Sequence, residues 1–270
     1  MAVTPPPNGH VDWTRLDAIL FDLDGVLTPT AVIHERAWAE MFNGFLSRRA
    51  AATGEPLAPF SADDYLAYVD GKPRFDGVRS FVESRGIELP EGSLDDPPGD
   101  DTICALGNSK NAAFQHVLRS DGIAAYPGSL RFLDEAVAAG KAVAVVSSSR
   151  NAPEVLAAAH LSDRFAVVID GAVAAAEGLA GKPQPDTFVA AAGHLGVVVD
   201  RSVVVEDALS GVAAGRAGAF GAVVGVDRGA GHDALLAAGA DVVVTDLVEL
   251  LPVSPSNPAP TSPSSIERTP

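Results

Sequence analysis

The chain has 270 residues, of which 47% are hydrophobic and 20% charged, proportions typical of a globular protein that can bury a sizeable core. Its formal net charge is −16, from 19 basic and 35 acidic residues. A surface of this sign repels polyanions, so neither nucleic acid nor a membrane is expected as a partner. An anionic substrate would require Lys and Arg side chains concentrated at its site, against the field of the whole molecule.

The two ends of the chain look unlike the rest. Residues 1–12 are polar and rich in proline, and residues 253–270 are rich in serine and proline, so we expect two flexible tails. The N-terminus lacks the basic and apolar pattern of a secretory signal, and no apolar run is long enough to span a bilayer. The single cysteine, Cys104, excludes an internal disulfide. We therefore expect a cytoplasmic protein, and a monomer.

Short apolar runs rich in β-branched residues recur along the chain, separated by alanine-rich stretches of helical character. They lack polar alternation, which is typical of buried parallel strands, so the sequence predicts an α/β fold with a doubly wound parallel sheet. The expected strands are Ala18–Phe21, Ala142–Val146, Val167–Ile169, Val203–Val205, Ala222–Val226 and Val242–Val244.

More than a hundred residues separate the first two expected strands, far more than one crossover needs. Apolar side chains in this stretch recur at helical spacing, around Trp38–Phe45 and again around Val78–Val82. We therefore expect an α-helical cap domain inserted at residues 32–105. Residues 13–31 and 106–252 would form the α/β core.

Polar side chains follow three of the expected strands directly: Asp22, Ser147, and the pair Glu206-Asp207. The carboxyl ends of strands in an open α/β sheet meet at the ligand crevice, so these side chains should converge. Carboxylates placed this close repel one another unless a cation lies among them, and several hard oxygen ligands suit Mg2+. Any one of these residues alone could simply end a strand or cap a helix. Their coincidence favours a site.

The string from Asp22 to Thr28, Asp-Leu-Asp-Gly-Val-Leu-Thr, is the most specific in the sequence. Asp22 and Asp24 are separated by one residue and point the same way while the chain stays extended, and Gly25 permits a tight turn. One carboxylate could attack phosphorus while the other serves as acid and base for the reacting oxygen.

This string resembles the first motif of the haloacid dehalogenase superfamily, whose other motifs follow in order between about residues 16 and 252. The resemblance implies a Rossmann-like core with Asp22 as nucleophile and Asp24 as acid and base. It implies that Ser147 binds the transferring phosphoryl group and that Lys182, in Gly-Lys-Pro-Gln-Pro-Asp, balances its charge. The implied ligands of a Mg2+ ion are Asp22, Asp24 through its backbone carbonyl, Glu206 and Asp207.

Within the superfamily the insertion resembles that of the β-phosphoglucomutase family. The stretch from Thr28 to Trp38 resembles that family's linker into the cap, and Asp70–Arg74 resembles a cap loop whose arginine holds a distal phosphate. Ser109–Asn111 resembles the second linker, and Ser147–Asn151 a phosphate-binding loop. The substrate-binding residues implied in this way are Thr30, His34, Trp38, Gly71, Arg74, Lys110, Ser149, Arg150 and Asn151.

Several of these residues also have structural interpretations. Asn151 begins the string Asn-Ala-Pro-Glu, a good helix start, so capping is its expected role beside phosphate binding. Trp38 on a helix is commonly a core residue, and His34 at a domain junction is commonly a hydrogen-bonded structural one. The sequence departs from the β-phosphoglucomutase pattern at two positions: Arg150 stands where a lysine is common in that family, and Pro29 where an acidic residue is common. These departures leave the choice of sugar open.

The resemblance implies interconversion of β-D-glucose 1-phosphate and D-glucose 6-phosphate through phosphorylated Asp22 and a 1,6-bisphosphate intermediate. It implies Mg2+ and glucose 1,6-bisphosphate as cofactors and a small sugar phosphate as partner. A sugar-phosphate phosphatase of the same fold is the nearest alternative. A phosphonate hydrolase would need a cap lysine for a Schiff base, which the sequence does not place. A non-catalytic binding module is a further alternative, although every catalytic motif is intact.

Overall fold

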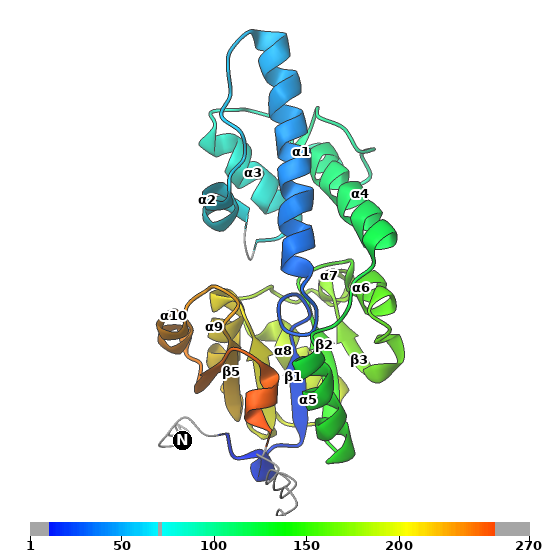
Figure 1. Cartoon of the computed structure of the whole chain (residues 1–270), viewed down its shortest axis with the longest axis vertical. Coiled ribbons are helices and arrows are strands. Elements are labelled where there is room, and N and C mark those ends of the chain that lie inside the picture. The colour runs from blue at the N-terminus through cyan, green and yellow to red at the C-terminus, as the bar shows by residue number, and fades with distance from the viewer. Residues whose placement is uncertain (1–10, 70–71, 252–270) are drawn as a thin grey trace, which may run out of the picture.

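The computed structural model describes residues 11–69 and 72–251. An α/β part and a helical part are joined by two segments of chain (Figure 1). The predicted tails, residues 1–12 and 253–270, lie outside the described residues except for residues 11 and 12. Val11 is buried in the main apolar cluster. No helix in the described part of the chain combines the length and the apolarity needed to cross a bilayer.

Six parallel strands form one sheet in the order β3-β2-β1-β4-β5-β6, which confirms the predicted doubly wound α/β fold. Five strands have the predicted bounds, and β4 is one residue longer at each end. The strands are β1 (Ala18–Phe21), β2 (Ala142–Val146), β3 (Val167–Ile169), β4 (Ser202–Glu206), β5 (Ala222–Val226) and β6 (Val242–Val244).

The strand order places the crevice of the sheet between β1 and β4. From β1 the chain proceeds outward to β2 and β3, then returns to β4 on the other side of β1, so the crossovers diverge at this point. The register pairs Phe21 with Val205, and the Asp22 N–H donates to the Val205 carbonyl at 2.9 Å. The acidic residues that follow β1 and those that end β4 therefore lie at the same level of the sheet.

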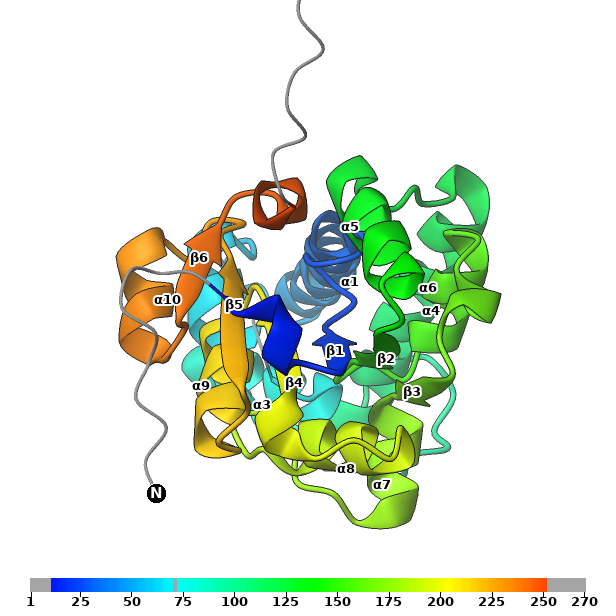
Figure 2. The same cartoon turned by 90° about the horizontal axis from the view of Figure 1, so that it is seen from below.

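Helices cover both faces of the sheet (Figure 2). Adjacent strand residues such as Leu20 and Phe21 face opposite helical layers, because successive side chains of a strand point to opposite sides of the sheet. One face packs against α5 (Pro127–Ala138), α6 (Ala152–Ala158) and the last turns of α4 (Ile103–Asp121). The other face packs against α7 (Gly171–Glu177), α8 (Asp186–His194), α9 (Leu209–Ala217) and α10 (His232–Ala238). Short 3-10 turns lie at Trp13–Arg15, Ser162–Arg164, Val199–Arg201 and Leu247–Leu250.

The helical part has an apolar core of its own. The Phe42 and Phe81 rings lie 4.1 Å apart by their centroids, and Phe60 is 5.1 Å from each of them. The apolar residues that the helical spacing singled out are buried in this core. Its elements are α1 (Thr30–Thr53), α2 (Ala62–Asp64) continuing into a π-helical turn (Tyr65–Val69), α3 (Arg74–Ser84) and α4 (Ile103–Asp121).

Both connections between the two parts are helical. Helix α1 starts at Thr30, two residues before the predicted insertion, and α4 runs through residues 105 and 106, where the insertion was predicted to end. In α4, Leu106 packs in the core of the helical part, whereas Phe114 and Leu118 pack under the sheet. Side chains on these two helices are therefore placed by both cores at once.

Candidate active site

Lys182 lies at the centre of the acidic cluster between β1 and β4. Its Nζ is 2.5 Å from Asp22 Oδ1 and 2.6 Å from Glu206 Oε1, and it donates to the Val146 carbonyl at 3.1 Å. The loop before α8 therefore delivers a cation to the ends of three neighbouring strands. Burial alone would lower the pKa of Lys182, but the charges of Asp22 and Glu206 outweigh it and hold the pKa above its ordinary value. The ammonium stays charged.

Asp22 is almost fully buried at the end of β1. Burial raises its pKa well above the usual range of an aspartate; Lys182 opposes this rise, and the charges of Glu206 and Asp24 add to it. One oxygen of the Asp22 carboxylate is thus bound by Lys182, and the neighbouring Glu206 and Asp24 carboxylates leave an excess of negative charge around it. A carboxylate in this setting is stabilised by any further cation that reaches it.

A divalent cation fits the residues present. One carboxylate oxygen from each of Asp22, Glu206 and Asp207 lies within 4.8 Å of the others, and the Lys182 ammonium pairs with two of these three carboxylates. Burial raises the pKa of Asp207, and the charges of Glu206 and Asp22 raise it further. Within the described residues Asp207 accepts no hydrogen bond, so its oxygens are free for a ligand. Hard oxygen donors with uncompensated charge suit Mg2+.

Glu206 is more constrained than the other two carboxylates. Its Oε1 accepts from Lys182, and its Oε2 accepts from the Ala208 N–H at 2.8 Å. A Cβ at Gly211 on α9 would lie 1.7 Å from Oε1, so glycine is required there for the carboxylate to reach its place. In this structure Glu206 binds Lys182, and its role as a metal ligand stays a prediction.

Asp24 belongs to a separate hydrogen-bond network. Its Oδ1 accepts a short hydrogen bond from the Thr30 hydroxyl at the start of α1, and its Oδ2 lies 3.3 Å from Ser147 Oγ after β2. Burial would raise the pKa of Asp24, but His34 and the Thr30 hydrogen bond hold it below its usual value. The two aspartates of the Asp-Leu-Asp string therefore have different environments, as separate nucleophile and acid-base roles require.

His34 and Lys110 bring the two linker helices together above Asp24. Lys110 Nζ is 2.6 Å from His34 Nδ1, and His34 Nε2 is 3.7 Å from Asp24 Oδ1. Burial, together with the charge of Lys110, lowers the pKa of His34. A neutral imidazole fits these neighbours, because its Nδ1 accepts from the ammonium while its Nε2–H faces the carboxylate. The ring stacks on Phe114 at 4.2 Å.

Lys110 itself is buried between aromatic rings. Its ammonium lies 5.0 Å from the ring centroids of both Trp38 and Phe114. Burial lowers the pKa of Lys110 to about 7, and the charge of Arg74 contributes. Trp38 is 5% exposed and stacks on Phe42, so its ring belongs to the core of the helical part as much as to the site.

Two arginines that the sequence predicted to bind phosphate have no carboxylate partner among the described residues. Arg74 begins α3 in the helical part and donates to Asn108 at 3.3 Å, and Arg150 is exposed in the loop after β2. Burial lowers the pKa of Arg74, and so does the positive charge of Arg150. The predicted Gly71 lies outside the described residues.

The loop after β2 is folded by its own hydroxyls. Ser147 Oγ accepts from the Ser149 N–H, and Ser149 Oγ accepts from the Asn151 N–H, each at 3.1 Å. Asn151 takes the N-cap position of α6, but its side chain does not cap that helix as the sequence predicted. Its amide donates instead to Asn111 of α4 at 2.7 Å. The capping prediction is wrong because a partner from a distant helix binds the side chain that local capping would use.

Some residues of the site were not singled out as functional by the sequence. Thr28 Oγ1 lies 3.2 Å from Thr30 Oγ1 and supports the hydroxyl that binds Asp24. Phe114, the stacking partner of His34, follows Lys110 by four residues, a helical spacing that could have indicated a shared face. Asn108, the Arg74 partner, carries no comparable signal.

Known proteins resemble this chain in sequence and in fold. A family model described as haloacid dehalogenase-like hydrolase matches residues 16–218. A β-phosphoglucomutase of Mycobacterium tuberculosis is 54% identical over 243 residues, covering 88% of this chain and 92% of that protein. A β-phosphoglucomutase of Bacillus subtilis is 30% identical over 238 residues, covering 87% of this chain and 92% of that one.

A solved structure has the same fold. The β-phosphoglucomutase of Clostridium difficile matches with a TM-score of 0.67 at 23% sequence identity, covering 87% of this chain and 93% of that chain. The resemblance that the motifs indicated is confirmed by the family match and by the mycobacterial relative. The chain belongs to the haloacid dehalogenase-like hydrolase family.

Proposed function

We propose that this protein is a phosphosugar mutase that interconverts β-D-glucose 1-phosphate and D-glucose 6-phosphate. The observation that carries the proposal is the presence of two separate cationic groups: Lys182 at the nucleophile, and Arg74 with Arg150, which have no carboxylate partner among the described residues. A sugar that carries phosphate at both ends requires both groups. The mycobacterial relative named β-phosphoglucomutase supports the choice.

Asp22 is the nucleophile in this proposal. Its free oxygen attacks phosphorus while Lys182 holds the other oxygen, so the attacking group is oriented before the substrate arrives. Lys182, Ser147 and the backbone N–H groups after Asp22 offset the charge on the phosphoryl oxygens. Mg2+ held by Asp22, Glu206, Asp207 and the Asp24 carbonyl would neutralise charge on the phosphoryl group and its neighbours.

Asp24 is the acid and base. Its pKa is held below the usual value, so it is ionised and can take the proton of the attacking sugar hydroxyl. Thr30 and Ser147 hold its two oxygens from the helical part and from the sheet respectively. The sugar hydroxyl receives the phosphoryl group from phosphorylated Asp22, which gives the bisphosphate and frees the Asp22 carboxylate. The bisphosphate then reverses its orientation, Asp22 takes the other phosphoryl group, and Asp24 returns the proton to the sugar oxygen that this group leaves.

The helical part binds the rest of the substrate and limits access of water. Arg74 and Arg150 would hold the distal phosphate, and Lys110 and His34 would contact the sugar near the reacting oxygen. Because α1 and α4 carry His34 and Lys110 and also pack under the sheet, movement of the helical part displaces these two side chains together. Excluding water favours transfer to sugar over hydrolysis.

The second candidate is a sugar-phosphate phosphatase, in which water takes the phosphoryl group from Asp22. The family description, hydrolase, favours it. Purified protein should be incubated with β-glucose 1-phosphate, Mg2+ and a trace of the 1,6-bisphosphate, with glucose 6-phosphate and free phosphate followed together. Glucose 6-phosphate without free phosphate supports the mutase, and free phosphate in step with substrate loss supports the phosphatase.

Two variants test the assignment of residues. Asp22→Asn should abolish turnover, and full activity in that variant would refute the role of Asp22. Arg74→Ala should reduce mutase kcat/KM by about 100-fold, in the range of a lost charged contact to phosphate. Arg79→Ala is the matched control, since Arg79 lies on the same helix in exposed ion pairs with Asp76 and Glu91. Equal mild effects of both variants would count against a two-ended pocket.

A further inference from the structure

Three consecutive backbone carbonyl groups in the loop after Asp22, at residues 25, 26 and 27, are held by donors from outside the loop. Arg228 Nε donates to the first at 2.9 Å, Ser129 Oγ to the second at 2.6 Å, and the Tyr126 N–H to the third at 2.9 Å. Two of these donors come from the start of α5, which packs firmly under the sheet. Of the three donors, Arg228 alone reaches the loop from the opposite half of the sheet, after β5.

Arg228 makes three different contacts at once. Besides Nε, its Nη1 donates to the Thr245 carbonyl at 2.8 Å, and its guanidinium lies against the Tyr126 ring at 3.9 Å from the centroid. Its own loop is held by Asp227, whose Oδ1 accepts from the N–H groups of residues 229 and 231. The guanidinium therefore connects the nucleophile loop, the start of α5 and the end of β6.

The carbonyl group that Arg228 binds belongs to Gly25, whose backbone is in close contact with Asp207. Gly25 has φ +89°, a conformation that side chains rarely adopt, and a Cβ there would lie 1.9 Å from Asp207 Oδ2. The Asp207 carboxylate therefore rests directly on the Gly25 backbone. Any displacement of this peptide changes the spacing between Asp207 and the two aspartates of the loop, Asp22 and Asp24.

We propose that Arg228 is a positioning residue, which fixes the Gly25 peptide and through it the alignment of Asp22 and Asp24 with Asp207. It touches no reacting atom. The inference rests on the proposed function for its effect on turnover, but the holding of the loop is a property of the protein without substrate or metal. Small displacements of reacting groups cost large factors in rate, so the effect falls on kcat.

The test compares Arg228→Ala with Ser202→Ala. Ser202 is fully buried at the start of β4 and donates to the Val198 carbonyl at 3.1 Å, so its variant removes a structural hydrogen bond at the end of the sheet away from the site. Arg228→Ala should lower kcat by roughly 10- to 100-fold with KM changed less than about threefold. Ser202→Ala should leave both near wild type.

Hydrogen exchange of metal-free protein provides a readout that does not depend on activity. Arg228→Ala should accelerate exchange at the amides of residues 25–28 and leave the strands unchanged, whereas Ser202→Ala should not affect that loop. If the amides of residues 25–28 exchange in Arg228→Ala at the wild-type rate, the proposal is overturned even if kcat falls. If wild-type protein turns over no sugar phosphate, the proposed function fails while the exchange comparison still decides the role of Arg228.

Arg228→Lys keeps the charge but cannot lie flat on Tyr126 or bond both carbonyls with one planar fork. It also serves if the alanine variant does not fold. Positioning by shape predicts that kcat in Arg228→Lys stays at least about fivefold below wild type and that exchange at residues 25–28 stays fast. Full recovery of both by lysine would show that charge alone suffices and would overturn the proposal.

Discussion

Lys182 and Asp22, which are 160 residues apart in the chain, form an ion pair of 2.5 Å at the end of the central strand, and both side chains are almost fully buried. The pair is one side of a three-way contact, because the same ammonium also binds Glu206. Removing the lysine would leave two buried carboxylates facing each other. The acidic crevice therefore depends on this cation for stability as well as for chemistry.

Lys182→Met should lower the free energy of unfolding by about 3–5 kcal/mol near neutral pH, since it leaves buried charge uncompensated. The loss should be smaller at pH 5 than at pH 8. Without Lys182 the pKa of Asp22 rises further, so protonation at low pH removes the unpaired charge. Urea titrations at the two pH values measure both effects, and a loss that grows toward low pH would contradict this account.

Binding of Mg2+ should become tighter as the pH rises above the ordinary titration range of an aspartate. The pKa values of Asp22 and Asp207 are raised, so part of each carboxylate is protonated in the metal-free protein and the cation must displace those protons. Calorimetric titration in two buffers of different ionisation enthalpy measures the protons released. Asp207→Asn should weaken binding at least tenfold, whereas Asp200→Asn, an exposed aspartate at the far end of the sheet, should not. Affinity that does not change with pH would contradict the prediction.

Lys110 should make the free energy of unfolding rise with pH between about 7 and 10. Its pKa is about 7 in the folded protein, below the ~10.4 of an unfolded lysine, so folding releases a proton in this range. Lys110→Met removes that dependence. The free energy of unfolding of Lys110→Met minus that of wild type should be largest near pH 6. This difference should fall by up to about 1.4 kcal/mol per pH unit above pH 7. A difference that is constant with pH would show that Lys110 keeps its ordinary pKa.

Gly211→Ala should impair the site although Gly211 touches no substrate. The new Cβ would lie 1.7 Å from Glu206 Oε1 and push that carboxylate off Lys182. We expect the free energy of unfolding to fall by about 2–4 kcal/mol and turnover to slow at least tenfold. Gly193→Ala is the matched control, in α8 with no atom near its added Cβ. It should be neutral or stabilising by up to about 1 kcal/mol. A loss of similar size in Gly193→Ala would show that the loss in Gly211→Ala does not arise from the Glu206 contact.

Part of the site was predictable because it depends on local sequence. The strands are short runs of buried β-branched residues, and the acidic residues stand immediately after two of them. Once the sheet is parallel, Asp22 and Asp207 must meet at its carboxyl edge. The helical insertion was indicated by apolar spacing within single helices, as at Phe42 and Phe81. Each of these inferences needs only neighbouring residues and one rule of topology.

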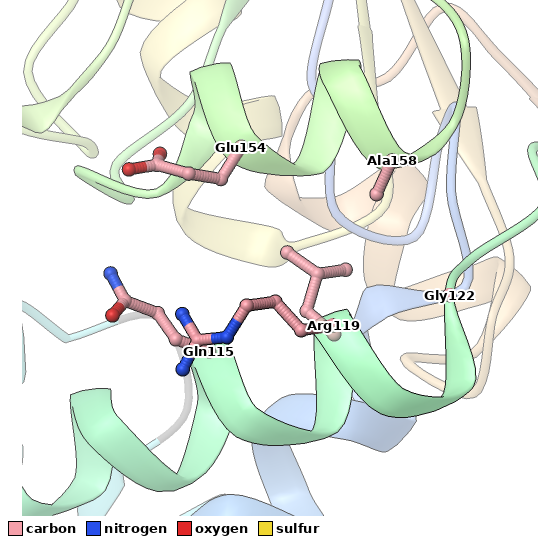
Figure 3. A pocket seen from close by; sticks show the side chains of 6 residues that line it. Gln115, Arg119, Gly122, Glu154 and Ala158 are labelled. Atoms are coloured by element: carbon pink, nitrogen blue, oxygen red, sulfur yellow. The ribbon is translucent and has the colours of Figure 1, made fainter.

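Other features required the folded chain. The sequence of Asn151 and its followers satisfies a capping pattern, yet its amide binds Asn111 because α4 packs beside α6. Figure 3 shows the space between these two helices, lined by Gln115 and Arg119 on one side and Glu154 on the other. A competition between a local and a distant partner is decided by packing, which no local pattern encodes.

By itself, the sequence determined the sheet, the helical insertion and the identity of the acidic cluster, because hydrophobic periodicity and strand-end polarity are local properties. The tertiary structure alone decided which oxygen each cation binds, that Lys110 is buried among aromatic rings, and that Arg228 holds the nucleophile loop. The contacts of Lys182 with Asp22 and of Arg228 with Gly25 join residues 160 and 203 positions apart, which meet only after the chain has folded.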